Sequence, residues 1–522
     1  MGMSSETVQF YDEQSPWTAS VAAGLSTNRA QINGDLVAKL TLAAAILAGV
    51  VLVAVWWAGV DMGTAIPIAA LSALAFTPGC AALLDKRVDP CSPIQFCAAY
   101  FLVAYAGRAI YLSLNLEAER VGAFYYEDYL PIALWTAVLA FGAFTAGYAA
   151  VRLDRPIRRI LSYLPSLAFG TEAMVPCALL AIGALGALRM ALVYGFTAGR
   201  SDLQVRESAA SPIPGWIPLV CDLVPMAFGI CACCAFSSRL SRRQRRSALV
   251  CMVPCAMVVV GRAALTGSKE AIVLPFGMLL LSYHYQRRRI SAPRAGIAML
   301  IAITALFPLF NITRGKLIPE AGGFPTSWSA AASLASHAGE YFGSLTLGEY
   351  LVEGAGGLLD RSAGVDALSL VMKYTPATSP YKLGQDYLVL PVASLVPRSL
   401  WPNKPLIDGS GDYERTYLNS YRQTFSSPHL IPDFYRNFGL AGVVVGAFVV
   451  GVCFKKLYAT FAPFAAFRPE CALWYGYCVL NCVHWLEADF VSYACTLMRD
   501  IPLLLLATWL AAKFPQTRNR ET

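Results

Sequence analysis

The chain has 522 residues, of which 57% are hydrophobic and only 14% charged, and its mean hydropathy is +0.52. A soluble protein of this size normally carries about 25% charged residues, so the composition excludes an ordinary soluble domain and predicts an all-α polytopic membrane protein. The formal net charge of +8 would fit a nucleic-acid partner in a soluble protein. Here much of the positive charge lies in short segments between apolar runs, where it indicates membrane orientation. We therefore expect no nucleic-acid partner.

Apolar runs of about 20 residues, the length that crosses a hydrocarbon core of roughly 30 Å, recur along the chain. The polar residues 1–37 lack the apolar region of a cleavable signal peptide and are expected to form a cytoplasmic segment, as is the tail 513–522. Between them the sequence predicts about 12 transmembrane helices, numbers 1–9 within 38–312 and 10–12 within 438–512. The predicted spans lie near 38–60, 62–84, 93–114, 130–151, 174–196, 216–236, 247–264, 270–286, 294–312, 438–454, 470–486 and 490–512.

The segments between these spans differ in charge. With a cytoplasmic N-terminus, the inner segments contain the basic runs DKR, RLDRPIRR, SRLSRRQRR and QRRRISAPR, whereas the outer segments contain NLEAER, GRSDLQVRE and WLEAD. This distribution follows the positive-inside rule. It predicts that both termini are cytoplasmic and that the long interruption 313–437 is an extracytoplasmic loop.

The interruption is too long for a mere connector, and its pattern indicates a partly helical fold. One helix is predicted over 327–354, with Ser327 or Ser329 as its N-cap. A second is predicted over 362–374, ending at the proline-rich run TPATSP. The remainder, with several X-Pro steps, is predicted to be an irregular loop. Packed helices with an irregular segment above the membrane suit a substrate-binding cap.

Several cations are predicted to lie in the outer halves or at the outer ends of spans, where a charge costs about 2.5–3.5 kcal/mol to insert. Snorkelling, or pairing with Asp500 or Glu487, explains any one of them. As a group they favour a phosphate or pyrophosphate ligand, because guanidinium groups offer a planar fork of donors to phosphate oxygens. The cations are Arg108, Arg189, Arg262, Arg499, Lys269 and Arg314.

The 15 cysteines fall mostly inside apolar runs, and none lies between Asn311 and Gly451. This distribution argues against a disulfide framework in the predicted outer loop. The run Cys231–Cys234 contains three cysteines, but no histidine or carboxylate lies near it in the sequence. We therefore expect no metal site there.

Three stretches of the C-terminal half resemble the oligosaccharide repeat-unit polymerase family, the Wzy-type polymerases of O-antigen and exopolysaccharide. They are VPRSLWPNKP at 396–405, SSPHLIPDFYRNFGLAGVVVGAFVVG at 426–451 and LTGSKEAIVLPFGMLLLSYHYQRRR at 265–289. The family pattern is a Pro-Arg-x-x-Trp-Pro-x-Lys-Pro run, then an acidic residue before Tyr-x-Asn-Phe-Gly at the start of a glycine-bearing helix. The resemblance covers about 260–455, with the motifs in the family's order.

The resemblance implies a bacterial inner-membrane glycosyltransferase with a GT-C-like architecture related to O-antigen ligases. Such an enzyme transfers a growing glycan from undecaprenyl pyrophosphate onto a new lipid-linked repeat unit and releases undecaprenyl pyrophosphate. It implies no metal and no other cofactor. The implied partners are the lipid-linked oligosaccharide donor and acceptor, membrane lipid and a chain-length regulator.

The family motif also implies roles for individual residues. Arg398 and Lys404 match its cations and would bind pyrophosphate or stabilise its developing charge; Lys269 and Arg314 would complete the clamp. Asp433 stands where relatives more often carry glutamate. Because Arg436 is close by, an ion pair that holds the loop in place is as good an explanation of Asp433 as a catalytic role. The full substrate-binding set is Lys404, Arg314, Lys269, Arg262, Arg436, Tyr435, Trp401, Arg108 and Arg189.

A proton acceptor for the attacking sugar hydroxyl is predicted less directly. His337 shares a helix face with Glu340, and the pKa of a histidine lies near working pH. His429 is a second candidate, and either histidine has a purely structural alternative. Trp401 and Tyr435 would stack on sugar rings or anchor the chain at the membrane interface.

Three other functions remain open at this point. An O-antigen ligase uses the same donor but transfers the glycan to lipid A core. A lipid-linked oligosaccharide flippase would show pseudo-repeats and broken helices near the midplane, whereas this sequence concentrates polarity in one predicted loop. A structural assembly subunit is the last alternative.

Overall fold

The computed structural model describes most of the chain, and all regular structure in the described residues is helical. The described part of each predicted span is helical apart from a few residues at its ends. The described residues are 34–114, 127–151, 167, 178–185, 223–266, 270–301, 304, 308, 312–313, 317–320, 328–396, 400–401, 412–418 and 428–513.

Seven described helices are long and apolar enough to cross a membrane, which agrees with the membrane class predicted from composition. Four shorter helices lie among them: α11 (Leu223–Phe236), α13 (Glu270–Gln286), α14 (Ala292–Ile301) and α23 (Pro469–Trp485). The seven are α2 (Gly34–Trp57), α3 (Met62–Leu84), the helix Pro93–Leu114, α6 (Leu130–Ala150), α12 (Arg242–Thr266), α22 (Leu430–Ala465) and α24 (Phe490–Lys513). Pro93–Leu114 combines α4 (Pro93–Phe101), a π-helical turn (Leu102–Gly107) and α5 (Arg108–Leu114).

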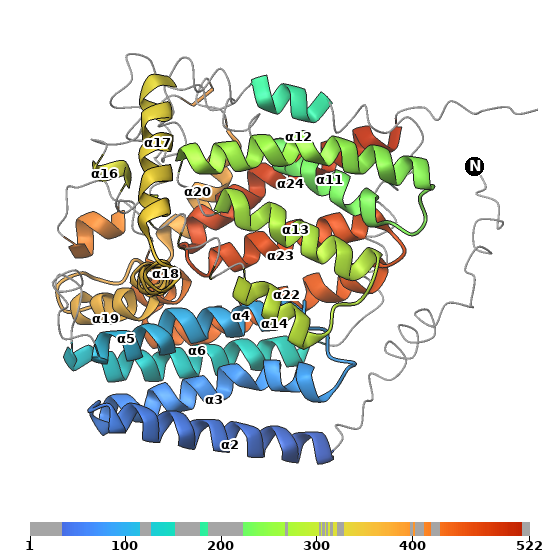
Figure 1. Cartoon of the computed structure of the whole chain (residues 1–522). Helices are drawn as coiled ribbons and strands as arrows, with labels where there is room; N and C mark the ends of the chain where they lie inside the picture. The colour runs from blue at the N-terminus through green and yellow to red at the C-terminus, as the bar shows by residue number, and fades with distance from the viewer. Residues whose placement is uncertain are drawn as a thin grey trace, which may run out of the picture.

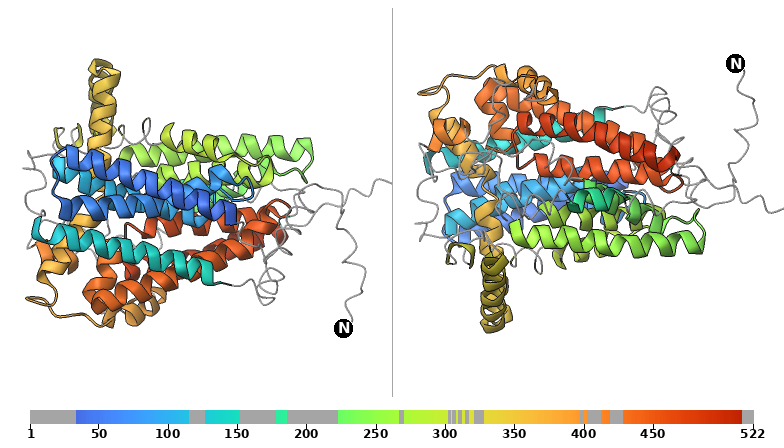
Figure 2. Two further views of the ribbon diagram at one scale, coloured as in Figure 1. Left: turned by 90° about the horizontal axis from the view of Figure 1, so that it is seen from below. Right: turned by 90° about the horizontal axis from the view of Figure 1, so that it is seen from above.

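The long helices run side by side in a bundle with two different ends (Figure 1; Figure 2). The described turns that join α3 to α4, α11 to α12 and α13 to α14 lie at one end, at the right of Figure 1, and carry the basic runs. We call this the basic end. The helices of the interruption gather at the opposite end, which we call the loop end.

At the loop end, α17 (Trp328–Ser344) stands upright in Figure 1 and α18 (Leu347–Arg361) is seen end-on, crosswise to the bundle. The single helix predicted over 327–354 is therefore wrong, because the chain breaks before Thr346. Thr346 and Glu349 form a capping box, in which the Thr346 side chain accepts from the Glu349 N–H and the Glu349 side chain accepts from the Thr346 N–H. The second predicted helix is confirmed as α19 (Gly364–Tyr374).

The irregular loop predicted after α19 contains a further helix, α20 (Gln385–Leu395), with Pro391 inside it. The proline led to the wrong prediction, since it removes a backbone donor and disfavours helix interiors. The apolar run YLVLPVASL is helical nonetheless, because its buried side packs on α24. Leu390 of α20 lies in one cluster with Val491 and Cys495.

Helix α22 begins at Leu430, earlier than the predicted span, and breaks at Gly439, whose φ of 65° and ψ of −153° are available to glycine. The first segment (430–438) folds back on the second (440–465). Gly442 and Gly446 make room for it, since a Cβ at either position would lie 2.6 Å from an atom of Phe434.

Two apolar clusters form the core. One joins α3, α4, α6, α19 and α22, and the other joins α11, α12, α13, α23 and the end of α22. Helices α6 and α22 cross closely at Gly147 and Gly451, where a Cβ would lie 2.1 Å from a carbonyl oxygen of the other helix. Helix α22 therefore belongs to both halves of the bundle and brings its first segment to the loop end.

Candidate functional site at the loop end

The first segment of α22 carries three polar residues on one face. Asp433, Arg436 and Asn437 follow the i, i+3, i+4 spacing, and all three are buried, Asp433 completely. Buried charges cost free energy unless they are paired and hydrogen-bonded. The partners of these residues therefore show what the segment holds together.

The Asp433 carboxylate accepts hydrogen bonds from three elements. Its Oδ1 lies 2.6 Å from Nε of Arg436. Its Oδ2 accepts from the Tyr387 hydroxyl at 2.9 Å and from the Phe490 backbone N–H at 3.0 Å. One carboxylate thus ties the first segment of α22 to α20 and to the start of α24.

The chain before α20 is docked on the same segment by backbone contacts. The Gly384 N–H donates to Oδ1 of Asn437 at 3.0 Å. The N–H groups of Lys382 and Leu383 donate to the carbonyls of Arg436 and Asn437, both at 3.1 Å. The entry to α20 is therefore fixed by main-chain geometry as well as by side chains.

Arg436 also extends the contacts toward water. Its second guanidinium nitrogen donates to Oδ2 of Asp412 at 3.0 Å, and Nζ of Lys382 forms an ion pair with the same oxygen. The Asp412 side chain is 32% exposed, whereas Asp433 is completely buried. We call this set the loop-end network: Asp433, Arg436, Asn437, Asp412, Lys382 and Tyr387.

Asp489, the residue before α24, lies buried beside this network. Its carboxylate caps the helix by accepting from the Ser492 N–H at 2.8 Å and from the Ser492 hydroxyl at 2.7 Å. Burial and then the negative charge of Asp433 raise the pKa of Asp489, while Arg436 opposes them. Asp489 thus adds a third carboxylate beside Asp433 and Asp412, which are paired with two cations, Arg436 and Lys382.

His429 lies next to the network, in an unusual backbone conformation (φ 63°, ψ 160°) that residues other than glycine rarely adopt. The Tyr100 hydroxyl donates to the Leu486 carbonyl at 2.6 Å. A hydroxyl has one proton, so Nδ1 of His429, 2.7 Å from the same oxygen, is the donor in that contact. The Leu430 N–H also donates to the Leu486 carbonyl, and α4, α22 and the turn after α23 are therefore joined.

Arg108 forms a second buried ion pair at the loop end. Its Nε donates to Oδ2 of Asp366 on α19 at 2.9 Å, its NH2 lies 3.4 Å from Oδ1, and both side chains are buried. Arg108 follows the π-helical turn, a local irregularity often found at functional sites. The partner is thus Asp366 rather than Asp500, which accepts from its neighbour Arg499 at 2.7 Å.

The remaining predicted site residues are placed as follows. Tyr435 is half-buried beside Tyr413 and Tyr417, and Trp401 is exposed. His337, exposed on α17, lies 3.3 Å from Glu320. Arg398, Lys404, Arg314, Lys269 and Arg189 lie outside the described residues, as does the side chain of Arg262 on α12.

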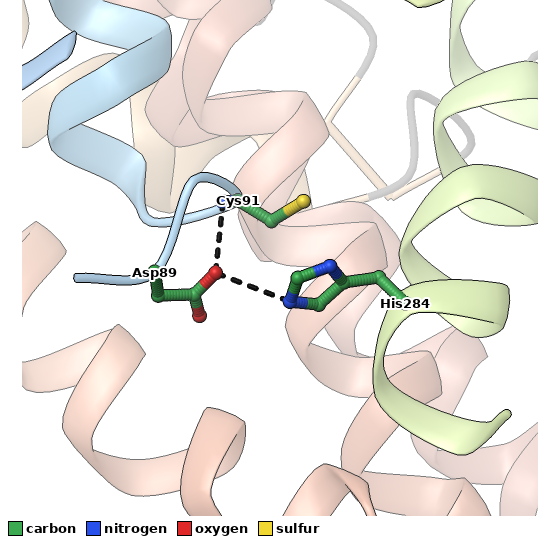
Figure 3. A group of neighbouring side chains, drawn as sticks. All are labelled: Asp89, Cys91 and His284. Carbon is green, nitrogen blue, oxygen red and sulfur yellow. Dashed lines mark hydrogen bonds and ion pairs between the residues drawn. The ribbon is translucent and has the colours of Figure 1, made fainter. Parts of the chain in front are cut away.

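At the basic end, three possible metal ligands lie close together (Figure 3). Single ligand atoms of Asp89, Cys91 and His284 lie within 4.8 Å of one another. Nδ1 of His284 accepts from the Ile290 N–H at 3.1 Å, so Nε2 carries the proton and donates to Oδ1 of Asp89 at 3.2 Å. A metal bound to Nε2 would displace that proton to Nδ1, where it would face the Ile290 N–H, a second donor. A metal-bound histidine instead needs a hydrogen-bond acceptor opposite its other ring nitrogen.

These residues fit a hydrogen-bonded joint better than a metal centre. Asp89 also accepts from the Cys91 N–H at 2.8 Å and from the hydroxyls of Tyr285 and Tyr458 at 2.6 and 3.0 Å. Burial opposes ionisation, but the hydrogen bonds from His284 and Tyr285 outweigh it and lower the pKa of Asp89. We call this set the basic-end cluster: Asp89, Cys91, His284, Tyr285, Tyr458 and Tyr475, whose hydroxyl donates to the Cys91 carbonyl at 2.7 Å.

Comparison with known proteins gives a match to one family model, a domain of unknown function (DUF8712), over residues 205–461. The matched range contains α17–α20 and most of α22, including the first segment. No curated protein and no solved structure matches the chain.

Sequence reasoning missed several residues of the loop end. Asp366 gave a usable signal, because it is the acidic residue of an otherwise apolar helical run, AGVDALSLVM. Asp412 and Lys382 gave none, since many neighbouring polar residues look equivalent, and Tyr387 gave none because it begins the apolar run YLVLPVASL. Asp489 was visible only as part of the outer segment WLEAD.

Proposed function

We propose that the chain polymerises undecaprenyl-pyrophosphate-linked oligosaccharide repeat units at the outer face of the bacterial cytoplasmic membrane. The observation that carries the proposal is the loop-end network. It holds the motif segment HLIPDFYRNFG, residues 429–439, at one end of a bundle of membrane-type helices. The second motif, residues 396–405, follows directly after α20, whose entry is docked on the same network.

The proposed reaction is a glycosyl transfer between two lipid-linked substrates. A hydroxyl oxygen of the new repeat unit attacks the anomeric carbon of the growing glycan. The bond from that carbon to pyrophosphate breaks, its electrons leave with undecaprenyl pyrophosphate, and the hydroxyl proton passes to a base. Arg398 and Lys404 bind the pyrophosphate and stabilise its developing charge, and His337 is the candidate base.

Within this proposal Asp433 and Arg436 are positioning residues. Four donors contact the Asp433 oxygens, and Arg436 is paired with Asp433 and Asp412. Neither is accessible to a sugar. They fix the position of the loop-end helices. Trp401 and Tyr435 then stack on the glycan, and the other cations bind pyrophosphate. Those cations are Arg314, Lys269, Arg262 and Arg189, and Arg108 positions α19 through Asp366.

A deletion strain tests the reaction. Loss of the protein should leave acceptors that carry a single repeat unit, with long polymer missing, because export and ligation continue without polymerisation. An O-antigen ligase would instead leave complete polymer on undecaprenyl pyrophosphate. Repeat units that accumulate facing the cytoplasm would indicate the transporter and contradict the proposal.

The pyrophosphate clamp is tested separately in strains that express single variants. Arg398→Ala and Lys404→Ala should each abolish long polymer while the protein stays in the membrane at wild-type amounts. Lys456→Ala is the matched control, because it removes an exposed cation from the second segment of α22, toward the basic end. Normal chain length in both loop variants would refute the clamp.

A further inference from the structure

Helix α20 differs from the other loop-end helices in its composition. No charged residue occurs between Asp386 and Arg398, and Ser394, the one hydroxyl residue of the helix apart from Tyr387, donates to the Pro391 carbonyl at 2.6 Å. By contrast, α17 carries the exposed ion-paired His337, and α18 opens with the exposed capping box. From Tyr387 to Leu395, α20 has the composition of a membrane helix.

The contacts of α20 show how it lies against the bundle. The Tyr387 ring packs on the Phe490 ring with centroids 4.6 Å apart, at the start of α24. Leu390, one turn later, packs with Val491 and Cys495, also further along α24. The two helices therefore run in the same direction, away from the loop-end network, along the candidate membrane span Phe490–Trp509.

The side of α20 that faces away from α24 is apolar and exposed. Leu388 is 80% exposed and Val392 61%, and Leu395 lies on the same side. Val50 of α2, in the middle of the most apolar candidate span, is also 61% exposed. Met498, on the same face of α24 as Val491 and Cys495 and one turn beyond them, is exposed as well.

We propose that α20 is a re-entrant half-helix whose exposed apolar side lies in lipid hydrocarbon rather than in water. Its 11 residues span roughly 16 Å at 1.5 Å per residue, about half of a hydrocarbon core of roughly 30 Å. Because α20 packs along the candidate span α24, the acyl chains that surround that span also cover the exposed side of α20. The loop-end network marks where this helix leaves the polar side.

The proposal does not rest on the enzymatic one, but it moves part of the predicted extracytoplasmic loop into the membrane, and Arg398 of the proposed clamp follows the inserted helix by three residues in the sequence. Backbone groups at such a depth must be satisfied inside the protein. The helical hydrogen bonds of α20 meet this requirement for most of its length, and the Ser394 hydroxyl donates to the Pro391 carbonyl. The docked entry at Gly384 provides the fixed point from which the helix enters the leaflet.

Spin labels on single introduced cysteines test the proposal in the full chain, reconstituted in phosphatidylcholine vesicles. Leu388→Cys, Val392→Cys and Leu395→Cys report on α20. Val50→Cys is the matched lipid-facing control, and Ala377→Cys, in the exposed turn after α19, is the control for water. The unmutated chain gives the background from native thiols. Collision with oxygen, which concentrates in hydrocarbon, is compared with collision with a water-soluble nickel chelate.

We expect the α20 labels to resemble Val50→Cys, with several-fold higher oxygen than nickel accessibility. The ratio should rise from position 388 to 392 to 395, because the helix penetrates with α24. Nickel accessibility equal to that of Ala377→Cys would refute the proposal. A flat ratio along the helix would indicate one lying at the interface and would refute insertion. Low accessibility to both reagents would show that another segment or a second copy covers α20, which would also overturn it.

Discussion

The basic-end cluster and the loop-end network both bury carboxylates between helices, but they differ in how the charge is met. At the basic end, Asp89 accepts from hydroxyl, backbone N–H and imidazole donors of the α3–α4 turn, α13 and α22. At the loop end, Asp433 is met by a guanidinium, and further carboxylates lie close by. The hydrogen bonds of the basic-end cluster are satisfied within the protein. The loop-end network contains several charges of both signs, whose balance a ligand or a proton can change.

The difference follows the position of the two sets in the chain. The basic-end cluster joins helices by hydroxyl, imidazole and backbone donors with little exposure to water. The loop-end network runs from buried Asp433 to partly exposed Asp412, and it holds the motif segment 429–439 of the proposed site. Disrupting the loop end should therefore affect function and stability, whereas disrupting the basic end should affect stability alone.

The largest expected effect is that of Asp433→Ala. The change leaves Arg436 paired with Asp412 and removes the acceptor of the Phe490 N–H. The Tyr387 hydroxyl keeps only its longer contact, 3.4 Å, to the backbone carbonyl of residue 433. Breaking a buried ion pair from one side costs about 3–5 kcal/mol. We expect a marked fall in the midpoint of thermal unfolding in detergent, together with loss of long polymer in cells.

Asp386→Asn is the control for this variant, because Asp386 lies at the start of α20 and is only half-buried. It should unfold within a degree or two of the wild type and support normal polymer. If Asp433→Ala unfolds like this control, the network does not hold the loop end together.

The second prediction concerns Arg108 and Asp366. Arg108→Ala and Asp366→Ala should each destabilise the protein by about 3 kcal/mol, because each leaves one buried charge without its partner. The double variant should cost clearly less than the sum, with a coupling of about 1–3 kcal/mol. Thermal unfolding of the four proteins measures the cycle. Additive effects would mean that the pair contributes no interaction of its own.

The extent to which this fold follows from sequence is set by the range of the interactions concerned. Hydropathy over about 20 residues located the helices, because the cost of a polar group in lipid acts on each segment separately. The Asp433–Arg436 pair was foreseen as an alternative for the same reason, since i, i+3 proximity is local. The capping box of α18 was also present in the sequence, as Thr346-x-x-Glu349, but was not used.

Contacts between distant segments could not be found this way. Arg108 and Asp366 are 258 positions apart, and Tyr100 and His429 are 329 apart. No local pattern selects Asp366 over Asp500 as the partner of Arg108, because the choice depends on which helices the core brings together. In α20 the local signal was misleading, since Pro391 disfavours a helix that packing on α24 stabilises.

The third prediction tests whether the basic-end cluster has a structural role and binds no metal. Asp89→Asn removes a buried carboxylate that accepts several hydrogen bonds and should cost about 1–3 kcal/mol. Polymer length in cells should stay normal at permissive temperature. Neither zinc nor a chelator should shift the unfolding midpoint of the wild type. A rise with zinc that Asp89→Asn abolishes would show a metal site and contradict the hydrogen-bonded assignment of His284.

The smallest expected effect is a difference in pH dependence between the two ends. The pKa of Asp489 is raised above 3.8 by burial and by Asp433. Its contribution to stability is therefore present below pH 3.8 and is lost as pH rises through the raised pKa. Above that pH the ionised group destabilises the fold. At neutral pH, Asp489→Asn should therefore have an unfolding midpoint equal to that of the wild type or slightly higher, and this relative gain should disappear in acid.

The pKa of Asp89 is lowered, so its contribution to stability is present above pH 3.8 and is lost as pH falls through the lowered value. The unfolding midpoint of Asp89→Asn should therefore fall furthest below that of the wild type at neutral pH. Opposite signs in the two unfolding series would show that only the loop end gains stability from a bound proton. A loss for Asp489→Asn that is the same at every pH would instead reduce Asp489 to the N-cap of α24.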